Sequence, residues 1–467
     1  MNVGFETIGN ATLIAYDHEP VLVTDPWLQG SAYFGSWKLS HEVPPAQLDA
    51  ARRATYAWFS HGHPDHLNAD SLPLLSGKQI LLPDHFGGRI KRDLLQQGFN
   101  VRVMPDRQWI TLSPRIRALC IADYNQDAIL LIDINGRLIV NLNDASNRGW
   151  SRFVRDLIRH YDQSFLLALH GFGDADMLNY FGVDGQRLPL PGRAPLGQTI
   201  AAQCHFYGVR YFVPFSSMHR YQRTDSAWAS PVAATLDDYR KGFISDRCEM
   251  LPAFLRYDCQ RDRYETIHPP ETRNQLFAPE HFGDSWSDPL DASDVNKAEA
   301  YFRGIEKVRE GLDFINLRVG GRDHYIHFKP HTFMRFRRDV RGLTFETPRH
   351  SLMSAIDYQV FDDLLIGNFT KVTLHGAWGP RRLYPDFTPY VAKYADNGGA
   401  RTRKELSAYF AEYRRRDPFG HMQHLVEVKC ILPLQQSASN AIRGSFGPES
   451  SFYHAAKKGY WLVRKSL

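Results

Sequence analysis

The stretch Phe59-Ser60-His61-Gly62-His63-Pro64-Asp65-His66-Leu67 decides the fold, and it directly follows a β-like run at Tyr56–Phe59. Three imidazoles and one carboxylate fall within six residues here. Neutral imidazole and carboxylate are ligands of Zn, Fe and Mn, so this crowding disfavours a polar loop that merely holds histidines. His61 and His63 alternate along an extended segment and can point to one side, whereas Asp65 and His66 follow the turn and can face a second ion. The spacing H-x-H-x-D-H therefore predicts a site for two metal ions.

The sequence around this motif alternates short β-rich runs with helical patches over about the first 220 residues, which is typical of a layered α/β domain. Asn135-Gly136, between two apolar runs, predicts a two-residue hairpin turn. The expected helices are Ile90–Gln97 and Trp150–Tyr161. The expected strands are Ala11–Tyr16, Val21–Thr24, Tyr56–Phe59, Gln79–Leu82, Ile129–Ile134, Leu138–Asn141, Phe165–Leu169 and Val209–Val213.

A change of pattern after the first half of the chain predicts a second domain. The segment Asp284–Asp294 reads as a linker, and a helical pattern over Val295–Arg309 follows it. β-like runs come next, at Asp313–Val319 and His324–Phe328. We therefore expect a metal-binding catalytic domain over residues 1–285 and an accessory α+β domain over residues 286–467.

Composition and charge exclude several classes of protein. Hydrophobic residues make up 43% of the chain and charged residues 23%, which excludes wholesale disorder. The net charge of +5 over 467 residues is too dilute to indicate a nucleic-acid or membrane partner. No run approaches the roughly 20 apolar residues of a membrane helix, and the start lacks the pattern of a signal peptide. The five cysteines form no C-x-x-C pair, which favours a reducing cytoplasm over a disulfide framework.

The stretch Thr24-Asp25-Pro26-Trp27-Leu28 ends an apolar run upstream of the histidines. With the histidine motif, it resembles the metallo-β-lactamase fold superfamily. This resemblance implies an α/β fold, an αββα sandwich followed here by the C-terminal α+β domain. It also places Asp25 beneath the metals, where it holds the second ring nitrogen of a ligand histidine. Taken alone, Asp25 could equally be a turn aspartate before proline.

Further segments narrow the resemblance to the non-Rieske part of CMP-N-acetylneuraminate hydroxylase and its bacterial relatives, and more distantly to ascorbate-phosphate lactonase. The similarity is patchy but spans most of the chain. The Rieske spacing C-x-H…C-x-x-H occurs nowhere among the five cysteines of this sequence. Residues Phe314–Gly367 also resemble sterol-carrier-like modules, which implies a hydrophobic or lid-like accessory domain. The segments that carry the narrower resemblance are Asp25–Leu28, His41–Pro45, Ser60–Leu67, Ile129–Asp144, Pro214-Phe215 and Asp362–Gly367.

The superfamily resemblance implies three more ligands at strand ends. The bridging aspartate maps onto Asp144, where an apolar strand stops at a carboxylate, although a plain loop aspartate is the alternative. The middle histidine is absent, and Asp123 is the best candidate in its place. A carboxylate there shifts the preference from zinc toward iron or manganese, or leaves that metal position weak or empty. For the final histidine His219 is favoured over His170, which can instead face the substrate; either could be a hydrogen-bonded core histidine.

These ligands predict a dinuclear enzyme with two divalent ions, Fe favoured and Zn or Mn the alternatives. Together with the resemblance to a hydroxylase, they favour an iron-dependent oxygenase acting on a small polar metabolite, which needs either a separate electron-donor protein or electrons drawn from the substrate. The aromatic residues Trp27, Tyr33, Phe34 and Trp37 suit the closed cleft that this chemistry needs. The alternatives are a metallo-hydrolase of a lactone, phosphodiester or amide, and a catalytically dead binding module. The predicted metal ligands are His61, His63, Asp65, His66, Asp123, Asp144 and His219, with Asp65 and His170 as catalytic candidates and Asp25 as the supporting carboxylate.

Overall fold

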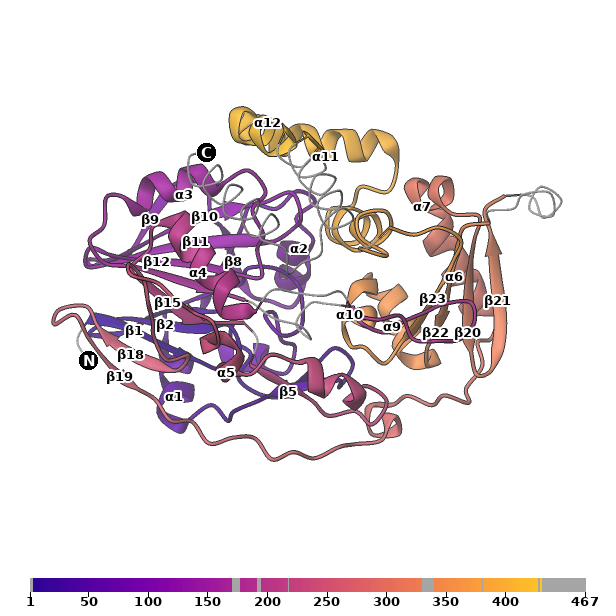
Figure 1. The fold of residues 1–467 in the computed structure, drawn as a ribbon, viewed down its shortest axis with the longest axis horizontal. Coiled ribbons are helices and arrows are strands. Elements are labelled where there is room, and N and C mark those ends of the chain that lie inside the picture. Colours follow the sequence, from indigo (N-terminus) through magenta and orange to yellow (C-terminus); the bar gives the residue numbers. More distant parts are fainter. Residues whose placement is uncertain are drawn as a thin grey trace, which may run out of the picture.

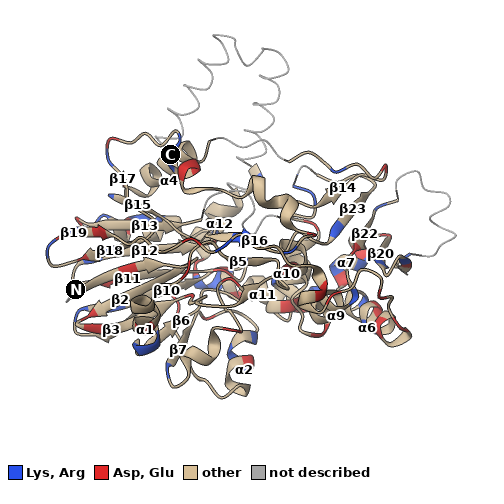
Figure 2. Ribbon diagram, turned by 90° about the horizontal axis from the view of Figure 1, so that it is seen from below, with Lys and Arg blue, Asp and Glu red and all other residues tan. Residues whose placement is uncertain are grey.

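The computed structural model describes residues 3–169, 177–190, 195–216, 218–329, 340–379, 381–426 and 429–430. Two large β-sheets lie face to face, and a smaller α+β part lies beside them (Figure 1). Basic and acidic residues are scattered over both parts (Figure 2). No helix in the described ranges combines the length and the apolar character needed to cross a bilayer.

The first sheet carries the histidine motif. Its strands β1, β2 and β3 form an antiparallel meander, whereas β3, β6, β7 and β8 run parallel. Parallel neighbours need crossover connections, which α1 (Pro45–Arg53), η1 (Leu72–Leu75) and α2 (Arg89–Gln96) supply here. The carboxyl ends of β3 and β6 therefore meet at one edge of the sheet. In spatial order the strands are β19 (Arg263–Thr266), β18 (Leu255–Asp258), β1 (Val3–Ile8), β2 (Thr12–Asp17), β3 (Glu19–Thr24), β6 (Tyr56–Trp58), β7 (Gln79–Leu82) and β8 (Asn100–Val103).

The second sheet is built around the predicted hairpin. Asn135 and Gly136 have φ angles of 51° and 78°, as a type I′ turn requires, and they join β11 to β12. Strands β12, β13 and β15 are parallel neighbours. The connections between them contain α3 (Ser151–Ile158) and α4 (Leu196–Tyr207). The carboxyl ends of these strands also share an edge. In spatial order the strands are β17 (Glu249–Met250), β15 (Tyr211–Pro214), β13 (Ser164–Ala168), β12 (Arg137–Asn143), β11 (Ala128–Ile134), β10 (Ile116–Ala122) and β9 (Trp109–Ser113).

Alternation along the strands separates three apolar layers. In β2, Leu13 belongs to the core between the sheets, whereas Ile14 belongs to the layer beneath α1 and α2. Across the central core Phe5 of the first sheet meets Phe165 of the second edge to face, at 5.2 Å between ring centroids. Val154 of α3 covers the outer face of the second sheet. Helices thus cover both outer faces, and the predicted αββα sandwich is confirmed.

The smaller part has its own five-stranded sheet and its own apolar core. The helix expected over Val295–Arg309 is two helices, which break at Gly304. Strand β14 joins this sheet although it lies in the chain before residue 285, and the division at that residue stays a prediction. The strands are β14 (Tyr180–Phe181), β23 (Lys371–His375), β22 (Gly342–Glu346), β20 (Phe314–Val319) and β21 (Arg322–His327). The helices are α6 (Ala292–Arg303), α7 (Glu306–Gly311), α9 (Arg349–Asp357) and α10 (Phe361–Ile366).

Several short elements connect the two parts. A three-stranded sheet contains β16 (His219–Tyr221), β5 (Trp37–Leu39) and β4 (Ser31–Ala32). Near the C-terminus, α11 (Arg403–Arg416) and α12 (Pro418–Val426) extend from the smaller part over the large sheets (Figure 1). Tyr409 of α11 donates to the carbonyl of Tyr124, and the Tyr124 hydroxyl lies 2.9 Å from His424 Nε2 of α12. The remaining elements are η2 (Ala227–Val232), α5 (Leu236–Arg240), η3 (Pro279–Phe282) and the π-helix η4 (Pro389–Asn397).

Candidate metal centre

Asp25 lies beneath the histidine loop because of strand pairing. Thr24 at the end of β3 pairs with Trp58 at the end of β6, so the residues that follow both strands become neighbours. The Asp25 backbone N–H donates to the Trp58 carbonyl at 2.8 Å, and the Ser60 N–H donates to Asp25 Oδ1 at 2.7 Å. Asp25 has a φ of 39° and is fully buried. This carboxylate therefore fixes the start of the loop that carries the histidines.

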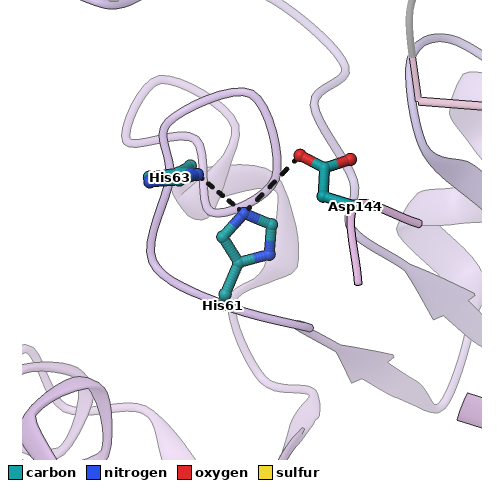
Figure 3. A group of neighbouring side chains, drawn as sticks. All are labelled: His61, His63 and Asp144. Carbon is teal, nitrogen blue, oxygen red and sulfur yellow. Dashed lines mark hydrogen bonds and ion pairs between the residues drawn. The ribbon is translucent and has the colours of Figure 1, made fainter. Parts of the chain in front are cut away.

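The first group of metal-type ligands is His61, His63 and Asp144 (Figure 3). His61 Nε2 lies 2.9 Å from His63 Nδ1 and 3.9 Å from Asp144 Oδ2. The two histidines come from the loop after β6, and Asp144 follows the end of β12 in the opposite sheet. The packing of the two sheets therefore brings Asp144 of one sheet edge next to the two histidines of the other.

The second group is Asp65, His66 and Asp144. His66 Nε2 lies 3.3 Å from Asp144 Oδ2 and 3.5 Å from Asp65 Oδ2. The Ser216 hydroxyl donates to the other oxygen of Asp144, Oδ1. Asp144 Oδ2 is thus the atom that both groups approach, which is the arrangement needed for a carboxylate shared by two ions.

Each histidine of the two groups uses its second ring nitrogen elsewhere. His66 Nδ1 lies 3.1 Å from Asp25 Oδ2, and His61 Nδ1 lies 2.8 Å from Ser60 Oγ. His63 is turned the other way, with Nε2 2.9 Å from Asp362 Oδ2. A carboxylate can only accept, so Asp362 favours the proton of a neutral His63 on Nε2, whereas the Ser60 hydroxyl can either accept from or donate to His61 Nδ1. Nε2 of His61, Nδ1 of His63 and Nε2 of His66 are left facing the two groups.

The protonation of the cluster reflects its burial and its negative charge. Burial, followed by the neighbouring His66 and His63, lowers the pKa of His61 well below its usual range and keeps this imidazole neutral. Burial also acts to lower the pKa of His66, but Asp65, Asp144 and Asp25 outweigh it and raise that pKa well above its usual range. When no metal ion is bound, the protonated His66 ring carries a positive charge that partly compensates the carboxylates around it.

The donor set fits divalent metal ions. Asp25, Asp65 and Asp362 are buried around the three imidazoles and Asp144 is partly buried, and in the described part of the chain Lys393 is the one lysine or arginine in contact with this cluster. Buried carboxylates are costly unless they are paired or coordinate a metal. Two divalent ions would balance this charge and would replace the proton on His66. His61, His63 and Asp144 would hold one ion, and Asp65, His66 and Asp144 the other.

Asp65 is held by two donors that the sequence analysis did not single out for this role. The Tyr33 hydroxyl donates to Asp65 Oδ1 at 2.5 Å, and Asn10 Nδ2 donates to Oδ2 at 3.0 Å. Burial and then the charge of Asp65 raise the pKa of Tyr33 well above its usual range, so the phenol stays a donor. Tyr33 reaches this position in the left-handed region, at a φ of 51°, which costs about 1–2 kcal/mol for a residue with a side chain.

The layers and the site together decide the fold. Two sheets packed face to face, covered by helices, hold the H-x-H-x-D-H loop, Asp25 and Asp144 at one shared edge. The chain has a metallo-β-lactamase-like fold. The predicted fold is thereby confirmed, and His/Asp groups that can hold metal ions lie where this fold gathers its strand ends.

Comparison with known proteins adds a distant, partial homology. No family model matches the chain. The cytidine monophosphate-N-acetylneuraminic acid hydroxylase of Asterias rubens is 33% identical over 141 residues, which are 28% of this chain and 22% of the hydroxylase. The hydroxylase of Gorilla gorilla gorilla is 29% identical over 140 residues, covering 28% of this chain and 23% of that protein. The chain thus matches less than a quarter of the length of these curated relatives.

The solved structures that are similar to the chain have lower sequence identity to it. Igni18, a metallo hydrolase from Ignicoccus hospitalis, is 14% identical with a TM-score of 0.36, covering 57% of this chain and 99% of that chain. CmlA, a diiron beta-hydroxylase from Streptomyces venezuelae, is 14% identical with a TM-score of 0.34, covering 57% of this chain and 54% of that chain.

Two predicted ligands lie outside the groups that the described residues form, and the catalytic candidate His170, the rival of His219, falls outside the description. Asp123 Oδ1 accepts from the backbone N–H of Asn125 at 2.7 Å, and burial raises the pKa of Asp123 to about 8. His219 lies on β16, where its ring stacks on Trp37 at 3.5 Å between centroids. Neither residue enters a group with the His61–His66 loop. His170 lies outside the described residues, and the choice of the last histidine ligand stays a prediction.

The smaller part contributes residues that sequence reasoning missed. Asp362 and Asp363 of α10 form a further group with His63. Lys393 of η4 places Nζ 3.3 Å from His63 Nε2 and 3.8 Å from Asp362 Oδ2. Asp362 had entered only as part of a family resemblance. The sequence signal that could have identified Asp362 was a pair of adjacent acids inside the apolar run Phe361–Ile366, because buried acids need a partner. No feature of the sequence pointed to Lys393 as a site residue.

Proposed function

We propose that the protein is a metal-dependent enzyme with a dinuclear centre. The observation that carries this proposal is the position of Asp144 Oδ2, which belongs to both ligand groups. One carboxylate shared by two ions holds them close enough to act together on one substrate. The buried carboxylates around the imidazoles support the same conclusion, since they need cations in place.

We further propose an iron-dependent oxygenase that hydroxylates a small polar metabolite. The partial homology to hydroxylases supports this choice. The fully buried Trp27, Tyr33 and Trp37 near the cluster also support it, because they exclude water from one side of the centre. Asp123, which the sequence analysis offered as a third reason, lies outside the ligand groups and gives no support.

Hydroxylation by dioxygen needs two electrons and two protons beyond the substrate, since the second oxygen atom leaves as water. The Rieske cysteine and histidine spacing does not occur in this sequence. We propose that a separate electron-donor protein supplies the two electrons and that the two protons come from solvent. Bound iron would provide the redox chemistry that activates dioxygen. The chain's own part is to hold Asp65 through Tyr33 and Asn10, and to orient His61, His63 and His66 so that one ring nitrogen of each faces the ligand groups. His170 remains the candidate for contact with the substrate.

A hydrolase is the second candidate, and the composition of the ligand groups is compatible with it. Three of the five ligands are imidazoles, which suits zinc as well as iron. Zinc or manganese would supply Lewis acidity for the hydrolysis of a lactone, phosphodiester or amide.

Metal analysis of the full-length protein tests both candidates. We expect about two equivalents of iron per chain after anaerobic purification, in line with two ligand groups. A reduced chemical donor should then drive oxygen consumption that depends on a polar metabolite; the cytidine monophosphate sugar acids named for the relatives are the first to try. Two equivalents of zinc, with hydrolysis of an ester or phosphodiester and no oxygen uptake, would favour the hydrolase. A protein that binds no transition metal would overturn both.

A further inference from the structure

His63 Nε2 has two neighbours from the C-terminal part of the chain. Asp362 Oδ2 lies 2.9 Å away and Lys393 Nζ lies 3.3 Å away, 299 and 330 residues later in the sequence. Asp362 belongs to α10, which lies on the side of the smaller part that faces the large sheets (Figure 1). Lys393 belongs to the π-helix η4, a rare form that is common at functional sites.

Asp362 and Lys393 favour opposite protonation states of His63 Nε2. A neutral imidazole carries a single proton, so Nε2 either donates to the Asp362 carboxylate or accepts from the Lys393 ammonium. If Nε2 carries the proton, the Nδ1 lone pair faces His61 and Asp144. If Lys393 donates instead, the proton sits on Nδ1, which lies 2.9 Å from His61 Nε2, and His63 can no longer bind an ion there.

We propose that Asp362 selects the metal-binding tautomer of His63, and that the first metal position is complete only when the C-terminal part supplies this carboxylate. The inference rests on the proposed dinuclear centre. Asp362 and Lys393 are positioning residues, since they act through His63. The contact to Asp362 is the shorter one, and a hydrogen bond to an ionised carboxylate is the stronger kind.

Lys393 supports this arrangement as long as Asp362 is present. Its ammonium lies 3.7 Å from Asp127 Oδ1 in the first part and 3.8 Å from Asp362 Oδ2 in the second. It thereby compensates two buried carboxylates and links the two parts of the molecule. Once Asp362 is removed, the Lys393 ammonium remains beside His63 Nε2 and favours the tautomer with the proton on Nδ1, which cannot bind the first metal ion.

The group His63, Asp362 and Asp363 is not a third metal position on this interpretation. Lys393 Nζ is within 4 Å of both His63 Nε2 and Asp362 Oδ2. A buried cation already occupies the side of these ligands where an ion would have to approach. Repulsion between the ammonium and a divalent ion disfavours joint occupancy.

Cobalt titration of the metal-free, full-length protein tests the proposal through affinity and the visible absorption of bound Co²⁺. Asp362→Ala should weaken one of the two binding steps by about 10–100-fold, the usual effect of losing an outer partner of a ligand histidine. The other step should stay unchanged, because Asp362 contacts no ligand of the second group. Asp294→Asn is the matched control: it alters another buried carboxylate of the same part, bonded to Arg349, and should change neither step.

The double variant Asp362→Ala/Lys393→Met gives the sharpest test. Removing the ammonium as well frees the imidazole to choose its tautomer, so part of the lost affinity should return. Asp362→Asn, which keeps the shape and an accepting oxygen, should show a smaller loss and serves if Asp362→Ala fails to fold.

The outcomes separate this inference from the proposed function. If His63→Ala loses one ion while Asp362→Ala and Asp362→Asn bind two ions as the wild type does, the positioning role is wrong and the dinuclear centre stands. If the double variant recovers nothing, the competition by Lys393 is wrong. If the wild-type protein binds no Co²⁺, the dinuclear centre itself fails.

Discussion

His66 Nδ1 lies 3.1 Å from Asp25 Oδ2, where the parallel strands β3 and β6 end side by side. The same aspartate accepts the backbone N–H of Ser60 through Oδ1. One carboxylate therefore fixes both the start of the histidine loop and the ring of its last histidine.

Replacement of Asp25 by asparagine should weaken metal binding by about 10–100-fold without abolishing it, because the residue acts through His66. Competition with a chromophoric chelator measures this change. Asp133→Asn, which alters a carboxylate of the second sheet bonded to Arg117 and Tyr161, is the control and should bind as the wild type does. Unaltered affinity in Asp25→Asn would show that the supporting role is wrong.

Tyr33→Phe should destabilise the metal-free protein by about 1–3 kcal/mol, since it leaves a buried oxygen of Asp65 without its donor. Urea unfolding followed by circular dichroism gives the free energy. The matched control is Tyr358→Phe, because Tyr358 is 72% exposed and should contribute little. Equal stability of the two variants would contradict the short contact between Tyr33 and Asp65.

Metal binding should release a proton from His66. Its carboxylate neighbours raise the pKa of His66 well above its usual range, so the ring is charged in the metal-free protein at about pH 7. Because an ion needs the neutral ring, affinity should rise with pH, by up to about tenfold per pH unit for one proton. Calorimetry in buffers of different ionisation enthalpy counts the released protons, and a count of zero would contradict this assignment.

Asp123→Asn should flatten the pH dependence of stability. Burial raises the pKa of Asp123 from 3.8 to about 8, so the folded protein holds this proton more tightly than the unfolded chain does. The tightly held proton of Asp123 therefore stabilises the fold fully below about pH 4, and this contribution is lost as the pH rises toward 8. Urea unfolding at several values between these limits should show a smaller decline for the variant.

The same variant separates the two interpretations of Asp123. If this residue is a ligand, as the sequence predicts, Asp123→Asn loses one ion. Its position outside the ligand groups predicts that both ions stay, and metal analysis of the purified variant decides between them.

Sequence reasoning located the parts of the site that local chemistry encodes. His61, His63, Asp65 and His66 are neighbours in the chain, whereas Asp25 and Asp144 were assigned through the superfamily resemblance, at positions where apolar runs end. All six lie in or beside the ligand groups. Alternating β-rich runs and helical patches predicted a layered α/β domain correctly, because buried sheet faces impose that pattern on the residues; the αββα arrangement came from the family resemblance.

Residues brought together by packing alone could not be predicted in this way. Asp362 and Lys393 reach His63 from elements some 300 residues away, and no spacing in the sequence encodes that contact. The break at Gly304 was missed for a related reason. The pattern over Val295–Arg309 continues through the glycine, whereas α6 ends at Arg303 and α7 begins at Glu306, with residues of both helices in the smaller core.

The link between His63 and Asp362 also bears on how the enzyme is made. A ribosome has to synthesise nearly four-fifths of the chain before Asp362 exists, and Lys393 emerges later still. We expect the nascent histidine loop to fold first and to bind the first metal ion weakly until these late residues dock. Prematurely terminated products that lack Asp362 should then fill the second metal position more readily than the first.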